Sequence, residues 1–483
     1  MALRRWSVAL LAAAMAFWPA AMPAAFAADD GSRPTARVKL VFLHHSVGQN
    51  WLDDDQGRLG AVLNANNYFV SDTNYGWGPD SIGDRTDIPN WWEWFRGPNS
   101  ARYLAAVYAQ SGQNSPYTRT LSDPGGPNQI VMFKSCFPNS SLAGGPNDNA
   151  AVGNQLTVAN AKYVYNELLR YFATRPDKLF VVVTAPPNSE TQYAANARAF
   201  NNWLVYRWRS ENHYPYRNVA VYDFYNVLTG PNNHHRLVGG VEQHVSVPGM
   251  NSAYYVSGGD DHPTPAGSVK ARNEFVPLLN AFYHRWRTPT RSPTIATMRL
   301  PAIPAQDGWV SESARSSGAG VSVNATGQTL TVGDNSTNRA YRTVMSFDTS
   351  KIPANAWVMS ATVKVKGAAV TGRNPFLTHR SLVTDIRKPY FGSSSALAPQ
   401  DFQAVPSRSA VGAVSPTATA GWYSAALPNT ANQWLNFGGT TQFRLRFLNS
   451  TDGDGIADTV SFYSGNAVTP ANRPVLEVRY LVP

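Results

Sequence analysis

The chain has 483 residues, 43% of them hydrophobic, so it is long enough to bury more than one core. Its 41 Lys and Arg against 31 Asp and Glu give a formal net charge of +10, yet no basic cluster is dense enough to predict a nucleic-acid partner. Cys136 is the single cysteine, which excludes an intramolecular disulfide.

Residues 1–27 are typical of a secretory signal peptide. The pair Arg4-Arg5 precedes an apolar run over 8–21, and Ala25-Phe26-Ala27 offers the small-x-small pattern of a cleavage site. The run is shorter than the roughly 20 residues that a spanning helix needs, which disfavours the alternative of an uncleaved anchor. We therefore expect a secreted or periplasmic protein with no membrane span once the signal is removed.

Residues 28–287 alternate between strand and helix patterns, which predicts a parallel sheet with helices on both faces. In such sheets, chemistry gathers where the strands end. Strands are predicted at 38–43, 68–70, 130–136, 179–183 and 219–222, and helices at 58–66, 158–174, 193–209 and 265–286.

A linker at 288–294, stiffened by Pro289 and Pro293, separates this part from a second one. Gly, Ser, Thr and Asn become frequent from 295 to 483, and alternating segments appear at 329–332, 358–366, 442–447 and 475–481. This pattern predicts an all-β domain, either a sandwich or a jelly roll.

Two distant motifs carry the candidate chemistry. Ser46 follows the first strand, where a nucleophile would lie at the open edge of the sheet, although most serines in such positions only cap a helix. His262 follows Asp260 and Asp261 just before the last helix, which suits a general base oriented by an acid, although a surface turn would look the same. Together the motifs predict a Ser-His-Asp hydrolase.

Over residues 36–287 the arrangement resembles the SGNH (GDSL-type) hydrolases, because His44-His45-Ser46, Thr184-Ala185-Pro186-Pro187 and Asp260-Asp261-His262-Pro263 fall in the order of that superfamily's blocks. The resemblance implies a flavodoxin-like three-layer α/β fold and an ester hydrolase that requires no cofactor for catalysis. It also implies that Ser46 attacks, that His262 transfers the proton, and that Asp260 or Asp261 orients the imidazole.

The sequence departs from the superfamily pattern at the oxyanion hole. No Gly-x-Asn-Asp motif follows the third strand, and Lys134–Ser140 stands there instead. We predict Asn139 and the backbone N–H of Gly78 as the oxyanion donors. Ser135, which also follows a strand, is a rival nucleophile.

Aromatic and polar residues near these motifs are the predicted substrate contacts. The segment at 91–95 reads as a loop, so its tryptophans either line a sugar-binding cleft or pack in the core. The predicted contacts are His45, Asn50, Trp77, Trp91 and Trp92.

The second part, 295–483, resembles the DNRLR-type jelly-roll modules found beside polysaccharide-active enzymes. The resemblance rests on Asp307–Val310, Thr331–Arg339, Arg342–Asp348, Gly372–Phe376, Thr441–Phe447 and Phe462–Gly465. It implies carbohydrate binding or docking.

Three aspartates in this module alternate in a spacing that Ca²⁺ accepts: Asp452, Asp454 and Asp458. A structural Ca²⁺ site is one interpretation, and an Asp-Gly turn between two strands is the other.

The leading functional hypothesis is an exported carbohydrate esterase that removes acyl groups, with acetyl expected, from a polysaccharide or acylated glycan held by the second module. The alternative is a non-catalytic surface or matrix protein whose degenerate hydrolase domain only binds glycan.

Overall fold

The computed structural model describes residues 28–247, 260–288 and 293–482. The predicted signal peptide, Gly258-Gly259 and linker residues 289–292 lie outside the described residues. Within the described ranges, no helix combines the length and the apolar character needed to cross a bilayer.

The first half of the chain is an α/β domain built on a five-stranded parallel sheet in the order β2-β1-β3-β4-β5. Every residue of these strands is buried, because both faces of the sheet are covered. The strands are β1 (Val38–Leu43), β2 (Tyr68–Thr73), β3 (Ile130–Lys134), β4 (Leu179–Val183) and β5 (Val219–Tyr222).

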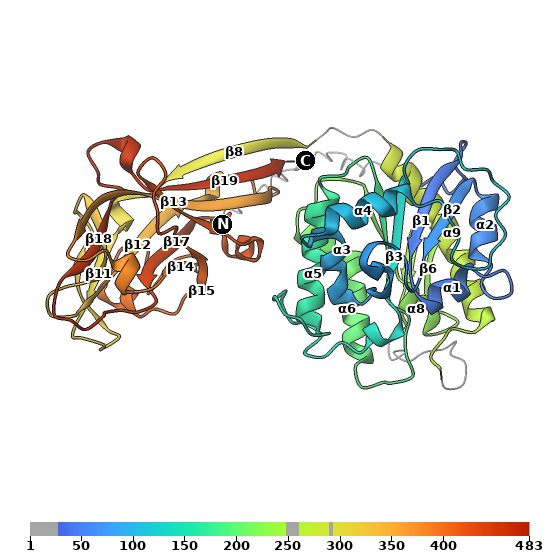
Figure 1. The fold of residues 1–483 in the computed structure, drawn as a ribbon, viewed down its shortest axis with the longest axis horizontal. Coiled ribbons are helices and arrows are strands. Elements are labelled where there is room, and N and C mark those ends of the chain that lie inside the picture. The colour runs from blue at the N-terminus through green and yellow to red at the C-terminus, as the bar shows by residue number, and fades with distance from the viewer. Residues whose placement is uncertain (1–27, 248–259, 289–292, 483) are drawn as a thin grey trace, which may run out of the picture.

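Helices cover the two faces of this sheet as separate layers (Figure 1). Alternate side chains of β1 serve the two cores: Val41 and Leu43 face one, and Leu40 and Phe42 face the other. The first core includes α3 (Trp91–Arg96), α4 (Ser100–Ala109), α5 (Val158–Phe172), α6 (Ala194–Tyr206) and α7 (Trp208–Glu211), and the second includes α1 (Ser46–Leu52), α2 (Leu59–Ala65), α8 (Phe224–Leu228) and α9 (Pro265–Arg287).

The loops at the carboxyl edge of the sheet contain short elements. These are the 3₁₀ helices η1 (Pro79–Asp84), η2 (Ile88–Asn90) and η3 (Phe137–Ser140), together with a hairpin formed by β6 (His234–Val238) and β7 (Val241–Val245). The hairpin turns at Gly239-Gly240, where both residues have positive φ, as a two-residue hairpin turn requires.

The loop predicted at 91–95 is a helix instead. Trp91, Trp94 and Phe95 are spaced by three and four residues, so α3 turns all three into the core, while Trp92 remains 38% exposed. Packing against the sheet therefore outweighs the turn residues that precede this segment.

The second half of the chain is an all-β domain of twelve antiparallel strands, in the order β15-β14-β17-β12-β11-β18-β13-β19-β8, with β9, β10 and β16 paired beside this path. The strands are β8 (Thr294–Pro301), β9 (Gly308–Glu312), β10 (Gly320–Asn324), β11 (Thr329–Asp334), β12 (Ala340–Asp348), β13 (Trp357–Thr371), β14 (Leu382–Arg387), β15 (Arg408–Ala413), β16 (Trp422–Leu427), β17 (Thr440–Phe447), β18 (Asp458–Tyr463) and β19 (Val475–Val482).

The strands pair into one continuous sheet, whereas the sequence pattern predicted a sandwich or a jelly roll. The 15-residue strand β13 pairs with β16 and β19 along its first part and with β18 along its last part, and the register shifts between Gly367 and Ala369. The sheet thereby curls around one hydrophobic core that receives side chains from both ends of this path.

The two domains also contact each other outside the linker. Arg170 of α5 donates hydrogen bonds to the carbonyl oxygens of Val358 and Met359, and its guanidinium faces the ring of Trp357. Tyr214 packs edge-on against the same tryptophan.

The neighbouring tryptophans of α3 provide a matched test of the helix. We expect Trp91→Ala to lower the free energy of unfolding of the α/β domain by about 3–5 kcal/mol, because it leaves a large cavity in the core. Trp92→Ala should cost less than about 1 kcal/mol. Urea unfolding followed by circular dichroism measures both, and similar losses for the two variants would contradict the helix register.

Candidate active site

Ser46 and His262 meet at the carboxyl edge of the parallel sheet. Ser46 begins α1 directly after β1, and His262 lies just before α9, yet Ser46 Oγ is 2.8 Å from His262 Nε2. Both side chains are partly exposed, so the hydroxyl can reach a substrate. Cys136, after β3, places its Sγ 3.8 Å from the same Oγ.

The other ring nitrogen of His262 faces Asp260. Nδ1 lies 3.0 Å from the backbone carbonyl oxygen of Asp260 and 3.6 Å from its carboxylate Oδ2. A carbonyl oxygen only accepts, so Nδ1 carries the ring proton and Nε2 is free to accept the proton of Ser46. The ring is therefore in the tautomer that a general base requires.

The structure distinguishes the two predicted acids. The carboxylate of Asp261 accepts a hydrogen bond from the backbone N–H of Ser189, in the loop after β4, and its backbone lies in the left-handed region with φ of 58°. Asp261 thus fastens the turn to the sheet edge, while Asp260, with a 66% exposed side chain, stays beside the imidazole.

A buried tryptophan holds the two halves of this site together. Trp51, on α1, donates its indole N–H to the backbone carbonyl of Ser268 on α9. Its ring packs against Phe224 and Phe275, with centroid distances of 4.6 and 5.2 Å. Since α1 carries Ser46 and α9 follows His262, this contact fixes the separation of the two reactive groups.

The first turn of α1 lies directly against the end of β1. A Cβ on Gly48 would lie 2.3 Å from the Cβ of His44, so only glycine fits there. His44 is buried, with Nε2 3.1 Å from Asp72 Oδ2, and Asp72 also accepts hydrogen bonds from Ser115 and Tyr117. This network ties β1 to β2 beneath the serine.

His45 positions the loop that contains Gly78. Its Nε2 lies 2.6 Å from the carbonyl oxygen of Gly83, and burial lowers the pKa of its imidazole, which favours a neutral ring that donates to this oxygen. The same ring stacks on Tyr75 at 4.0 Å. Gly78 is exposed in this loop with φ of 78°.

The side-chain hydrogen bonds of Asn139 and Ser135 are to residues other than Ser46 and His262. Asn139 is buried, donates through Nδ2 to Asp87 and accepts from the backbone N–H of Ile88, so it anchors η2. Ser135 is buried and accepts the indole N–H of Trp91. A buried serine with this partner is not available as the rival nucleophile.

The predicted substrate contacts separate into two groups. Trp91 is fully buried and its N–H is already bonded, so the structure corrects its predicted place on a cleft wall and puts it in the core. Asn50 on α1 and Trp77 are partly exposed, and Trp77 stacks on Trp94 at 6.1 Å. Trp92 is exposed on the outer side of α3.

Two residues after β3, Cys136 and Phe137, contact the Ser46–His262 pair, although the sequence did not identify them as site residues. Phe137 packs its ring against His262 at 5.4 Å, and Cys136 touches Ser46. Lys134 is fully buried, donates to the carbonyl oxygen of Ser135, and has a pKa lowered by burial. The position of these residues at a strand end was the available sequence signal for these contacts.

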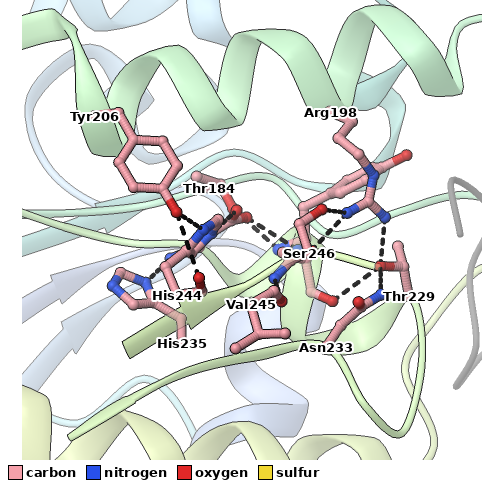
Figure 2. Close-up of polar contacts among 12 residues, drawn as sticks. Thr184, Arg198, Tyr206, Thr229, Asn233, His235, His244, Val245 and Ser246 are labelled. Atoms are coloured by element: carbon pink, nitrogen blue, oxygen red, sulfur yellow. Dashed lines mark hydrogen bonds and ion pairs between the residues drawn. The ribbon is translucent and has the colours of Figure 1, made fainter. Parts of the chain in front are cut away.

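A second polar network surrounds the β6–β7 hairpin (Figure 2). His244 of β7 lies between Asp223, at 2.8 Å from Nε2, and Tyr206, at 2.7 Å from Nδ1. Arg198 of α6 donates to Ser246 and Thr229 in the same region. These bonds hold the hairpin and the residues after it against α6 and the end of β5.

Comparison with known proteins adds little to this geometry. No family model matches the chain, and no curated protein matches it. One solved structure, whose description names no protein, is similar to 51% of this chain over 97% of its own length, at 14% identity and a TM-score of 0.25. That similarity carries no argument about the fold or the function.

The hairpin network makes a prediction about acid stability. Burial alone would raise the pKa of Glu242, but hydrogen bonds from His235 and Arg285 lower it from 4.5 to about 2. A carboxyl whose folded pKa is depressed stabilises the fold above its unfolded pKa and loses that contribution as the pH falls. The contribution, on the order of 3 kcal/mol, should disappear between pH 4.5 and 2.

Glu242→Gln should therefore flatten the pH dependence of the free energy of unfolding in that window. Chemical unfolding of wild type and variant at a series of pH values measures the difference. Parallel curves, with the same loss of stability on acidification in both proteins, would contradict the assignment.

Proposed function

We propose that this protein is a serine esterase that removes acetyl groups from a polysaccharide, with Ser46 as nucleophile and His262 as general base. The observation that supports this most directly is the 2.8 Å contact between Ser46 Oγ and His262 Nε2, in the tautomer that the carbonyl of Asp260 selects. The proposal also rests on the sequence resemblance to SGNH hydrolases.

The proposed reaction uses His262 Nε2 to accept and return protons, while Nδ1 keeps its proton toward Asp260. Ser46 Oγ attacks the carbonyl carbon of the ester while its proton passes to His262 Nε2. The bond between the acyl carbon and the sugar oxygen then breaks, and His262 returns the proton to the leaving alcohol. Water then attacks the acyl carbon while His262 takes its proton, the bond between the acyl carbon and Ser46 Oγ breaks, and His262 returns the proton to Oγ as acetate leaves. The Asp260 carbonyl and carboxylate stabilise the imidazolium that forms in each half-reaction.

Backbone donors are available for the developing oxyanion. Among the described residues, neither the N–H of Ser46 nor that of Gly78 has an acceptor, and His45, the neighbour of Ser46, contacts Gly83 in the loop that contains Gly78. We therefore propose these two groups as oxyanion donors. Asn139 keeps a supporting place in this proposal, because the bonds to Asp87 and Ile88 hold it at the base of the same loop.

The proposed superfamily fold agrees with the strand order. The order β2-β1-β3-β4-β5 corresponds to the 2-1-3-4-5 arrangement of flavodoxin-like sheets, in which ligands bind beyond the carboxyl ends of the strands. Ser46 follows β1 and Cys136 follows β3, which are the strands on either side of the switch point in that arrangement. We propose the flavodoxin-like fold for the α/β domain on this basis.

A polysaccharide substrate is proposed from the surroundings of the site and from the second domain. Tyr75 is 60% exposed and stacks on His45, the neighbour of Ser46, so it offers an aromatic face for a sugar ring. The all-β domain, by its resemblance to DNRLR-type modules, would hold the polymer. The predicted signal peptide would deliver the enzyme to a secreted or periplasmic location, where such polymers occur.

The adjacent aspartates give a sharp test of the catalytic assignment. With residues 28–483 and an acetyl ester such as 4-nitrophenyl acetate, Ser46→Ala should lower kcat/KM by about 10³-fold or more. Asp260→Asn should lower it on the order of 10–100-fold, less than in a triad held only by a carboxylate, because the backbone carbonyl still fixes the tautomer.

Asp261→Asn is the matched control, since asparagine tolerates the left-handed backbone at this position. It should leave kcat/KM close to wild type. Acetate released from an acetylated polysaccharide provides the second readout. Wild-type activity in Ser46→Ala, or an Asp261→Asn loss that equals the Asp260→Asn loss, would overturn the assignment.

A further inference from the structure

Two buried aspartates face each other inside the all-β domain. Asp334 ends β11 and Asp458 begins β18, and the two are direct partners in the antiparallel register. Both are fully buried. Like charges directly opposite each other destabilise a sheet, and burial increases that cost, so this pair needs compensation by a cation or by a proton.

A third buried side chain converges on the pair. His379 follows the short helix α10 (Pro375–Thr378), and its Nε2 lies 3.3 Å from Asp334 Oδ1. Ligand atoms of His379, Asp452 and Asp458 all lie within 4.8 Å of one another. Three buried atoms in this group have no hydrogen-bond partner among the described residues, namely Asp334 Oδ2, His379 Nε2 and Asp458 Oδ2.

The imidazole is oriented for a ligand at Nε2. Its Nδ1 lies 2.7 Å from the hydroxyl of Thr378, which can accept the Nδ1 proton and leave a lone pair on Nε2. The backbone of His379 is fixed as well, because its N–H donates to Pro375 and its carbonyl accepts from Asn449. A metal-binding histidine is usually held by such an outer partner.

We propose that His379, Asp452 and Asp458 bind one divalent transition-metal ion of the Zn²⁺ type, beside the buried carboxylate of Asp334. Carboxylate oxygens and an imidazole nitrogen form a common zinc ligand set, whereas Ca²⁺ prefers oxygen ligands alone. His379 and Asp458 are buried, and Asp452 is exposed, so it provides the open side through which an ion enters.

This site differs from the Ca²⁺ site predicted from the sequence. Asp454 points to other partners: its Oδ1 accepts the backbone N–H of Ile456, and its Oδ2 lies 3.6 Å from Arg373. His379 takes its place in the cluster. The sequence pattern of alternating aspartates could not show this, because the histidine lies more than seventy positions away.

The ion would fasten the loop at 451–458 to the turn between β11 and β12. Asn338, in that turn, already accepts hydrogen bonds from Thr451 and from the backbone N–H of Gly455. A metal shared by His379, Asp452 and Asp458, next to Asp334 at the end of β11, adds a link at the base of the same loop. The site is therefore structural, and it is independent of the proposed esterase activity.

The test uses the untagged protein, residues 28–483, after treatment with a chelator. Elemental analysis following equilibration with ZnCl₂ counts the bound metal, calorimetric titration gives the affinity, and differential scanning calorimetry follows the unfolding of the all-β domain. We expect one Zn²⁺ at this site, and a Tm that falls on chelation and recovers with Zn²⁺ but not with Ca²⁺.

Two exposed aspartates of the same loop form a matched pair that should fold equally well. Asp452→Asn should weaken Zn²⁺ binding by about tenfold or more and reduce the rise in Tm, while Asp454→Asn should leave both unchanged. Zinc bound elsewhere would not distinguish these variants.

Three outcomes would overturn the proposal. Absence of zinc binding, with a Tm insensitive to chelation, would mean that the buried aspartates are accommodated without a metal. Equal effects of Asp452→Asn and Asp454→Asn on zinc affinity and Tm would show that Asp452 is not a specific ligand. Recovery of Tm with Ca²⁺ and not with Zn²⁺ would reject the proposed metal class.

Discussion

The candidate active site depends on the contact between Trp51 and the backbone carbonyl of Ser268. A single hydrogen bond between Ser46 and His262 is worth only about 1 kcal/mol, too little to bring two distant loops together. The buried indole of Trp51 holds the two loops together more strongly. It joins α1 to α9 through a hydrogen bond and packs against Phe224 and Phe275. The reactive pair is thus set by the core, not by the pair itself.

The polar networks beneath the candidate active site differ from the aspartate cluster of the all-β domain. In the α/β domain, polar side chains below the site are paired: His44 with Asp72, and His244 with Asp223. These networks fix loops whose ends must lie within tenths of an ångström of one another. In the all-β domain, Asp334 and Asp458 retain atoms without hydrogen-bond partners among the described residues, so compensation must come from outside the chain or from a proton.

The sequence predicted the strands of the α/β domain because each is buried on both faces, and a run such as 179–183 then contains only apolar residues. It did not predict α3, since Pro89 and Asn90 suggested a loop, or the β6–β7 hairpin, whose partly exposed strands lack a clear alternation. Asp260 could not be chosen over Asp261 beforehand, because the hydrogen bond from Ser189 that occupies Asp261 joins two loops far apart in the sequence. The proximity of His379 to Asp334 could be seen only in the structure, because the two residues are far apart in the sequence.

The most direct measurement of the central claim is labelling with a fluorophosphonate probe, followed by peptide mass spectrometry. A hydroxyl activated by His262 should form one adduct on the peptide that contains Ser46, and His262→Ala should abolish it while Thr264→Ala retains it. Thr264 caps α9 beside the histidine without touching the serine. An unlabelled wild-type protein, or labelling of Ser46 that persists without His262, would contradict a functional dyad at this site.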